Sequence, residues 1–171
     1  MVKPNLLTPD LTRLAQTLGP RLIQLGTTIA TAESLTGGLL ASTLTYTPGS
    51  SAVFLAGVTA YANSAKKQIL GVTQQTLETQ GAVSLVTALA MAQGIRNLTK
   101  AEIGLATTGI AGPDGGTRVK PVGLCYVAAV GLGQELVEEL HFAGARHEVV
   151  EAAALAALDL LSRLLDRPLP A

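Results

Sequence analysis

A run without any charged side chain, from Ser34 to Ala65, constrains the fold of this chain more than any other feature of its sequence. Thirty-two uncharged residues in a row are typical of a buried segment, either in a protein core or in a membrane. Two turn sequences, Thr36-Gly37-Gly38 and Thr47-Pro48-Gly49-Ser50-Ser51, interrupt the run, so no continuous apolar stretch reaches the length that crosses a bilayer. We therefore expect a core segment and no membrane span.

The composition favours a single well-packed domain over residues 1–171. Hydrophobic residues make up 48% of the chain and charged residues only 14%, which predicts extensive burial and favours an oligomer. Twelve basic residues balance twelve acidic ones, and the aromatic residues are three Tyr and two Phe, so nucleic-acid binding is disfavoured. The single cysteine, Cys125, and a start without an apolar signal core lead us to expect a cytoplasmic protein.

Capping residues and hydrophobic periodicity predict alternating helices and strands. We expect helices at 9–25, 37–46, 64 or 65 to 70, 74–80, 85–98 and 146–165, and strands at 27–32, 54–61, 103–107, 122–130 and 135–142. The third and fourth strands are continuous apolar runs, and the last is more polar and edge-like. This order predicts an α/β domain with a largely parallel or mixed sheet that is covered on both faces.

Three glycine-containing turns are interpreted as lying just after strands, where an α/β sheet holds its ligands. They cover residues 32–38, 48–51 and 107–116. A helix that begins at Thr36 or Gly37 would direct free N–H groups toward an anion such as phosphate, but on spacing alone a plain tight turn is the favoured explanation of the glycines. None of the three matches a Walker loop or GxGxxG.

Several residues are weak candidates for chemistry. Cys125 lies inside a strand and is expected to be a buried, inert thiol. His147-Glu148-Val149-Val150-Glu151 lacks the second histidine of HExxH, so we expect no metal site. Ser64 and Lys67 have the SxxK spacing of penicillin-recognising enzymes, but the companion SDN and KTG motifs are absent and a chance match is the better explanation.

A second arrangement combines Ser51, Tyr61 and Lys66, which could converge at one edge of the sheet. A lysine serves as a general base only when neutral, and a neighbourhood without carboxylates disfavours its ammonium form, as does a helix N-terminus. The uncharged run supplies that neighbourhood, and Lys67 can stay solvated beside it. The alternative is that Lys66 reaches water and that Ser51 only forms a turn.

Six segments, in order and at the right spacing, resemble the CinA C-terminal domain family. They are AESLTGG, GSSAVF, the Tyr61 to Lys66 segment, GAVS at 81–84, TGIAGPDGG at 108–116 and KPVG at 120–123. Active members are nicotinamide mononucleotide amidohydrolases, so the resemblance implies release of ammonia from that nucleotide without a metal or cofactor. It also implies a three-layer α/β/α sandwich with a mixed, mostly parallel sheet, and a homodimer or other small homo-oligomer.

The resemblance further implies roles for particular residues. Ser51 would be the nucleophile, Lys66 its base and Tyr61 an assisting residue. The residues that would bind the nucleotide are Ser34, Gly37, Thr108, Gly109, Gly112 and Arg146.

Two departures and two alternatives accompany this resemblance. Leu35 stands where many members have cysteine, and Gly144-Ala145-Arg146 lacks the acid often found between glycine and arginine, which puts the anchoring of the arginine in doubt. The alternatives to the amidohydrolase are a catalytically silent nucleotide-binding or regulatory protein and an amidase that acts on another small amide.

Overall fold

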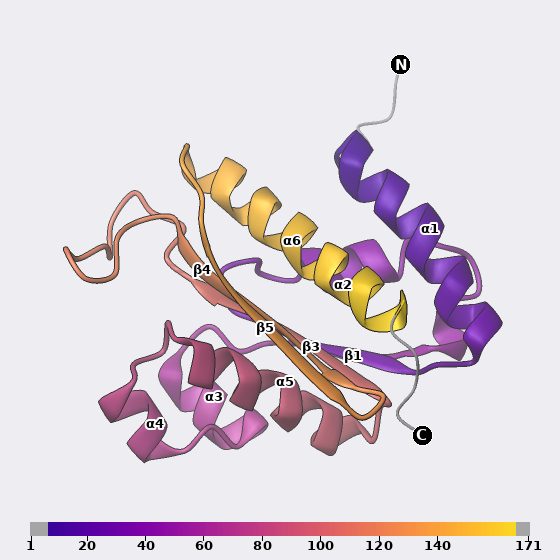
Figure 1. The fold of residues 1–171 in the computed structure, drawn as a ribbon, viewed down its shortest axis with the longest axis horizontal. Helices are drawn as coiled ribbons and strands as arrows, with labels where there is room; N and C mark the ends of the chain where they lie inside the picture. Colours follow the sequence, from indigo (N-terminus) through magenta and orange to yellow (C-terminus); the bar gives the residue numbers. More distant parts are fainter. Residues whose placement is uncertain (1–6, 167–171) are drawn as a thin grey trace.

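The computed structural model describes residues 7–166, which form one five-stranded sheet between two layers of helices (Figure 1). The elements in chain order are α1 (Pro9–Leu25), β1 (Ile29–Glu33), α2 (Leu39–Leu44), the 3-10 helix η1 (Ser50–Ala52), β2 (Phe54–Thr59), α3 (Asn63–Leu70), α4 (Gln74–Thr79), α5 (Leu85–Thr99), β3 (Ile103–Gly109), β4 (Leu124–Gly131), β5 (Gln134–His141) and α6 (Arg146–Asp166). In the described residues no helix is both long and apolar enough to cross a membrane.

The strand order is β2-β1-β3-β4-β5, and the sheet is mixed. β1 pairs in parallel with both β2 and β3, whereas β4 is antiparallel to β3 and to β5. The chain therefore leaves β1 toward one side through α2 and returns on its other side through α3, α4 and α5. Ligands in open α/β sheets bind at such a reversal of strand order, outside the carboxyl ends of the strands. A ligand site is therefore expected at the carboxyl ends of β1 and β3.

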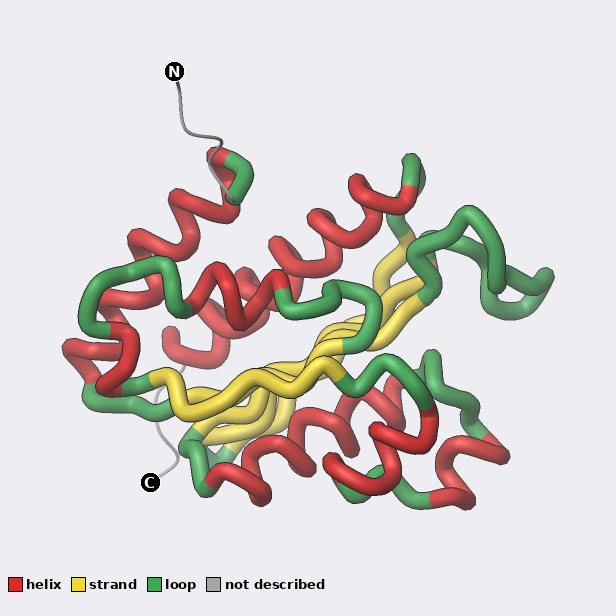
Figure 2. The backbone as a smooth tube through the Cα atoms, turned by 180° about the vertical axis from the view of Figure 1, so that it is seen from behind, coloured by secondary structure: helices red, strands yellow, loops and turns green. Residues whose placement is uncertain are grey.

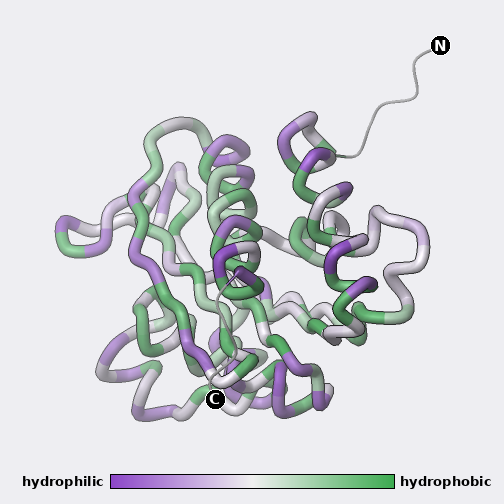
Figure 3. Tube along the Cα trace, turned by 45° about the vertical axis from the view of Figure 1, so that its right-hand side comes forward, coloured by the Kyte–Doolittle hydropathy of each residue, from purple (hydrophilic) through white to green (hydrophobic). Residues whose placement is uncertain are grey.

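Each face of the sheet has its own core, because successive strand residues point to opposite sides. α1, α2 and α6 cover one face, where Ile29 and Leu105 pack among leucines of these helices. α3 and α5 cover the other, where Ala30 and Ala32 pack against Leu70 and Met91. Figure 2 shows the sheet between the two helical layers, and in Figure 3 the helices next to the N and C labels, α1 and α6, carry both hydrophobic and hydrophilic turns.

The predicted α/β fold with helices on both faces is confirmed, and the local signals explain why. Thr73 and Ser84 begin α4 and α5, since each side chain accepts a hydrogen bond from the backbone N–H three residues later. Gly26 and Gly71 end α1 and α3 in the left-handed conformation, a position that glycine occupies without strain. The polar last strand lies at an edge of the sheet, as its pattern predicts.

Candidate active site

Lys66 is buried at the carboxyl end of the parallel strands, with only 1% of its surface exposed. It lies in the first turn of α3, just after β2, and its Nζ donates hydrogen bonds to the carbonyl oxygens of Ala60 (2.8 Å) and Tyr61 (3.2 Å). The third partner of Nζ is Ser34 Oγ, at 3.0 Å. Lys66 makes no ion pair with any carboxylate among residues 7–166. The amine is therefore surrounded by neutral oxygens and apolar groups.

Burial lowers the pKa of Lys66 from the usual 10.5 to about 8, because removal from water disfavours the ammonium form. A substantial fraction of the amine is then neutral near pH 8, and its lone pair can accept the proton of the Ser34 hydroxyl. Lys67, the next residue, is exposed and donates to the side chain of Gln74. Only the first of the two lysines has the environment that a general base needs.

Ser34 opens the turn between β1 and α2, at the reversal of strand order. Its N–H donates to the carbonyl of Thr107 at the end of β3 (3.0 Å), and its own carbonyl accepts from Gly37. Gly37 and Gly38 have φ values of 60° and 106°, which lets the turn close in a conformation that other residues rarely adopt. This turn holds the Ser34 hydroxyl against the Lys66 amine.

Two amides of this turn have no acceptor. The backbone N–H groups of Leu35 and Thr36 make no hydrogen bond within the described part of the chain, whereas those of Ser34, Gly37 and Gly38 all do. Amides that immediately follow a nucleophile are a common source of oxyanion stabilisation in hydrolases. The turn thus supplies a hydroxyl and two candidate donors within three consecutive residues, and α3 supplies the base.

Glu33 is a site residue that the sequence analysis missed. Its carboxylate is buried and accepts the N–H groups of Gly38, Leu40 and Ala41 at 2.9 to 3.0 Å. The expectation of free helical amides facing an anion is therefore wrong for α2. A signal existed in the sequence, since a lone acid at the end of a strand precedes a glycine pair and can cap the following helix.

Tyr61 and Arg146 lie next to this centre and join three loops. Arg146, at the start of α6, donates to the Tyr61 hydroxyl and to the carbonyl of Gly112, both at 2.7 Å. Tyr61 therefore faces Lys66 with its backbone carbonyl and Arg146 with its hydroxyl. The guanidinium keeps N–H groups for a further acceptor, since it has five in all.

The remaining predicted residues belong to β3 and the loop after it. Thr108 is buried and donates to the carbonyl of Ala82, so its hydroxyl braces the α4–α5 turn. Gly109 lies so close to Cys125 that a Cβ atom there would come within 2.8 Å of the Cys125 sulfur. Gly112 contributes the carbonyl that Arg146 binds. Figures 1 and 2 show the β3–β4 loop projecting beyond the end of the sheet.

The predicted meeting of Ser51 with Lys66 is wrong for this structure. Ser51 is exposed in η1, before β2, and the next residues lead to Val53, whose carbonyl accepts from Ile29 at the start of β1. Lys66 follows the other end of β2. A six-residue strand spans about 20 Å, so Ser51 lies at the amino end of β2 and Lys66 beyond its carboxyl end. Ser34 occupies the place beside Lys66 that was expected for Ser51.

The weaker candidates of the sequence analysis form no catalytic pair or metal site in the described residues. Ser64 and Lys67 are both exposed, and no hydrogen bond joins them in the described residues. Cys125 is buried, and its surroundings raise the pKa of its thiol to about 12. Among residues 7–166 no three His, Cys, Asp or Glu side chains gather as metal ligands would.

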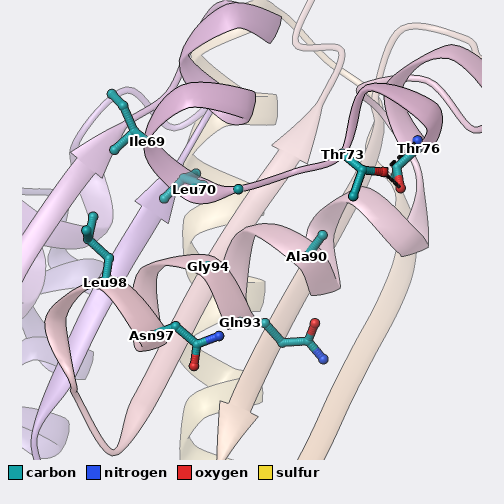
Figure 4. A pocket seen from close by; sticks show the side chains of 10 residues that line it. Ile69, Leu70, Thr73, Thr76, Ala90, Gln93, Gly94, Asn97 and Leu98 are labelled. Carbon is teal, nitrogen blue, oxygen red and sulfur yellow. Dashed lines mark hydrogen bonds between the residues drawn. The ribbon is translucent and has the colours of Figure 1, made fainter.

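Two of the cavities in the described part of the chain are large enough for a small molecule. One of about 510 Å³ lies between α3 and α5, and Figure 4 shows its lining, in which Thr73, Thr76, Gln93 and Asn97 are the polar side chains. It contains no nucleophile with a neighbouring base, so it is unsuited to acyl transfer. The other, of about 550 Å³, lies beside Arg146 and Leu39, the first residue of α2. Arg146 connects it to Tyr61 and Gly112 through the hydrogen bonds described above.

Comparison with known proteins places the chain in a family. The model of the CinA C-terminal domain matches residues 11–165. The chain belongs to the CinA C-terminal domain family. A CinA-like protein from Desulfotalea psychrophila is 47% identical over 156 residues, which cover 91% of this chain and 38% of that relative. This CinA domain spans 33% to 39% of the length of the curated relatives that it matches.

Solved CinA structures share the whole fold. The competence/damage inducible protein CihA from Agrobacterium tumefaciens is 42% identical with a TM-score of 0.91, over 95% of this chain and 99% of that one. A competence-damaged protein (CinA) superfamily protein from Escherichia coli is 36% identical with a TM-score of 0.87, over 95% of each chain. The three-layer architecture described above is thus that of the CinA superfamily.

Proposed function

We propose that this CinA domain hydrolyses the carboxamide of nicotinamide mononucleotide to nicotinate mononucleotide and ammonia, with Ser34 as nucleophile and Lys66 as general base. The observation that carries the proposal is the 3.0 Å contact between Lys66 Nζ and Ser34 Oγ, made by a buried amine that pairs with no carboxylate of the described residues. Activation of a serine hydroxyl by a lysine of lowered pKa is an established route to acyl transfer.

The backbone carbonyls of Ala60 and Tyr61 orient the Lys66 amine toward Ser34. A neutral amine has two N–H groups, which Ala60 and Tyr61 accept, so the lone pair is left to face Ser34 Oγ. Lys66 takes the Ser34 proton as Oγ forms a bond to the carboxamide carbon. The carbonyl oxygen becomes an oxyanion, and the amides of Leu35 and Thr36 are the donors that we assign to it.

Collapse of the tetrahedral intermediate breaks the C–N bond, and the Lys66 ammonium gives its proton to the departing nitrogen, which leaves as ammonia. The resulting ester on Ser34 is then attacked by water, whose proton Lys66 accepts. The second intermediate breaks the C–Oγ bond, and Lys66 returns the proton to Ser34. One base thus serves both halves of the reaction, and no further proton carrier is needed.

The nucleotide part of the proposal rests on the family resemblance and on the surroundings of Arg146. Guanidinium groups bind phosphate through paired N–H donors, and Arg146 has donors left after its contacts to Tyr61 and Gly112. The cavity of about 550 Å³ that Arg146 lines lies in the size range of small-molecule sites. The small homo-oligomer and the cytoplasmic location remain predictions.

The test is ammonia release from nicotinamide mononucleotide by the purified protein and two serine variants. Ser34→Ala should lower kcat at least 1,000-fold, roughly the loss expected when a nucleophile is removed. Ser51→Ala, before the amino end of β2 and away from Lys66, should keep kcat within about twofold. Loss of activity in Ser51→Ala alone would return the nucleophile to residue 51. Retention of the nucleotide without ammonia release would indicate a silent binding protein, and no interaction would indicate another amide as substrate.

A further inference from the structure

Glu33 is buried at the end of β1, and backbone N–H groups surround its carboxylate. Its exposed fraction is 1%, and no lysine, arginine or histidine of the described residues pairs with it. Three backbone N–H groups balance its charge instead, those of Gly38, Leu40 and Ala41. A buried carboxylate is costly unless it is compensated in this way, so the arrangement fixes the start of α2 relative to β1.

The same contacts determine which amides of the turn stay free. Glu33 occupies the N–H groups at the start of α2, while those of Gly37 and Leu39 bond to the carbonyls of Ser34 and Thr36. The amides of Leu35 and Thr36 are the pair in the described turn that no acceptor takes. Glu33 therefore closes the helix end to external anions and leaves these two donors for the reacting oxygen.

We propose that Glu33 is a positioning residue, which holds the Ser34 hydroxyl and the Leu35 and Thr36 amides in their reactive geometry. This inference rests on the proposed role of Ser34 as nucleophile. Glu33 and Ser34 are consecutive and point to opposite faces of the sheet, so Glu33 acts on the side of α2 while Lys66 approaches from α3. A change at Glu33 should therefore disturb the turn and leave the environment of the Lys66 amine intact.

The variant that tests this is Glu33→Gln. A side-chain amide has nearly the same shape, but its NH₂ group cannot accept the N–H donors that one carboxylate oxygen takes. We expect kcat to fall about 100-fold, because small displacements of catalytic groups cost factors of this size, while KM changes less than threefold. The apparent pKa of the acidic limb of kcat/KM should stay that of the parent. A purely structural role would lower the amount of folded protein and leave kcat per folded molecule unchanged.

Glu102→Gln is the matched control. Glu102 also accepts a backbone N–H beside β1, that of Thr28 at 2.8 Å, but at the opposite end of the strand. The same chemical change there should keep kcat and KM within about twofold of the parent. If Glu33→Gln does not fold, Glu33→Asp replaces it as the test: it keeps the charge and shortens the reach by one methylene, and its kcat should fall at least about 10-fold below that of the parent.

Two readouts do not depend on the nucleotide substrate. Hydrogen exchange of the amides of Gly38, Leu40 and Ala41 should be faster in Glu33→Gln and unchanged in Glu102→Gln. Labelling of Ser34 by a fluorophosphonate probe, followed by peptide mass spectrometry, should be at least 10-fold slower in Glu33→Gln. If the parent releases no ammonia but labels at Ser34 with this dependence, the substrate assignment fails and the inference stands. Unchanged kcat and labelling in Glu33→Gln, or no labelling of Ser34 in the parent, would overturn it.

Discussion

At the scale of single residues, the centre depends on two buried charged side chains that flank the uncharged run. Glu33 precedes the run and Lys66 follows it, and each is 1% exposed. Their compensation differs, because the carboxylate accepts three N–H groups while the amine has only neutral oxygens around it. Burial without a carboxylate partner lowers the pKa of the Lys66 amine to about 8. Glu33 fixes the turn that begins at Ser34 through its hydrogen bonds to the start of α2, and Lys66 places a base beside the Ser34 hydroxyl.

The lowered pKa of Lys66 predicts the pH dependence of the reaction. A base must be neutral, so kcat/KM should rise with pH and level off above about pH 8, the value to which burial brings its pKa. Near pH 7 about a tenth of the amine would be neutral. Ammonia release between pH 6 and pH 9.5 measures this. Lys67→Ala, one residue along the helix, should keep the same profile, and a flat profile below pH 8 would exclude Lys66 as the base.

At the scale of secondary-structure elements, the position of Lys66 depends on how α3 packs against α5. Gly94 of α5 faces the last turn of α3, and a Cβ atom there would come within 1.9 Å of the Leu70 carbonyl oxygen. Because that oxygen belongs to the backbone, no side-chain rotation relieves the clash. The two helices approach each other closely at this point, and α3 carries the base at its other end.

Gly94→Ala should therefore push α3 away from α5. Overpacking of this kind costs about 1 to 3 kcal/mol of the free energy of unfolding, and the better helix propensity of alanine offsets roughly 1 kcal/mol of it. We expect a net destabilisation in urea unfolding and a lower kcat, because Lys66 shifts with its helix. The control is Asn97→Ala on the exposed side of α5, which should be neutral or slightly stabilising. Equal stability of the two variants would contradict the close packing of α3 on α5.

Elements were more predictable from the sequence than the site was. Caps such as Thr73 and Ser84 and the period of apolar residues are local, so they predicted nearly every helix and strand. The partner of Lys66 depends instead on which end of a strand each turn occupies. Ser51 precedes β2, whereas Ser34 and Lys66 both follow strands, and parallel strands gather such residues at one edge. The same rule applied to strand ends would have selected Ser34.

At the scale of the whole molecule, the buried amine links stability to pH. The pKa of Lys66 is about 8 in the folded state and 10.5 in the unfolded chain, so between these values the unfolded chain binds more protons. Stability conferred through this group must then rise with pH from about 8 to 10.5, by about 3 kcal/mol in all if burial acts alone. Below pH 8 both states carry the proton and the contribution is constant.

Other groups oppose this trend, so a comparison with Lys66→Met isolates it. The raised pKa of the Cys125 thiol means that the unfolded chain loses that proton first, which lowers stability above about pH 9 in parent and variant alike. The difference in free energy of unfolding, parent minus Lys66→Met, should therefore increase from pH 8 to pH 10.5, as measured by urea unfolding at each pH. Lys67→Met, which removes an exposed amine, should show no such increase. A difference that stays constant across this range would mean that the amine keeps its ordinary pKa, and with it the general-base role of Lys66 would fall.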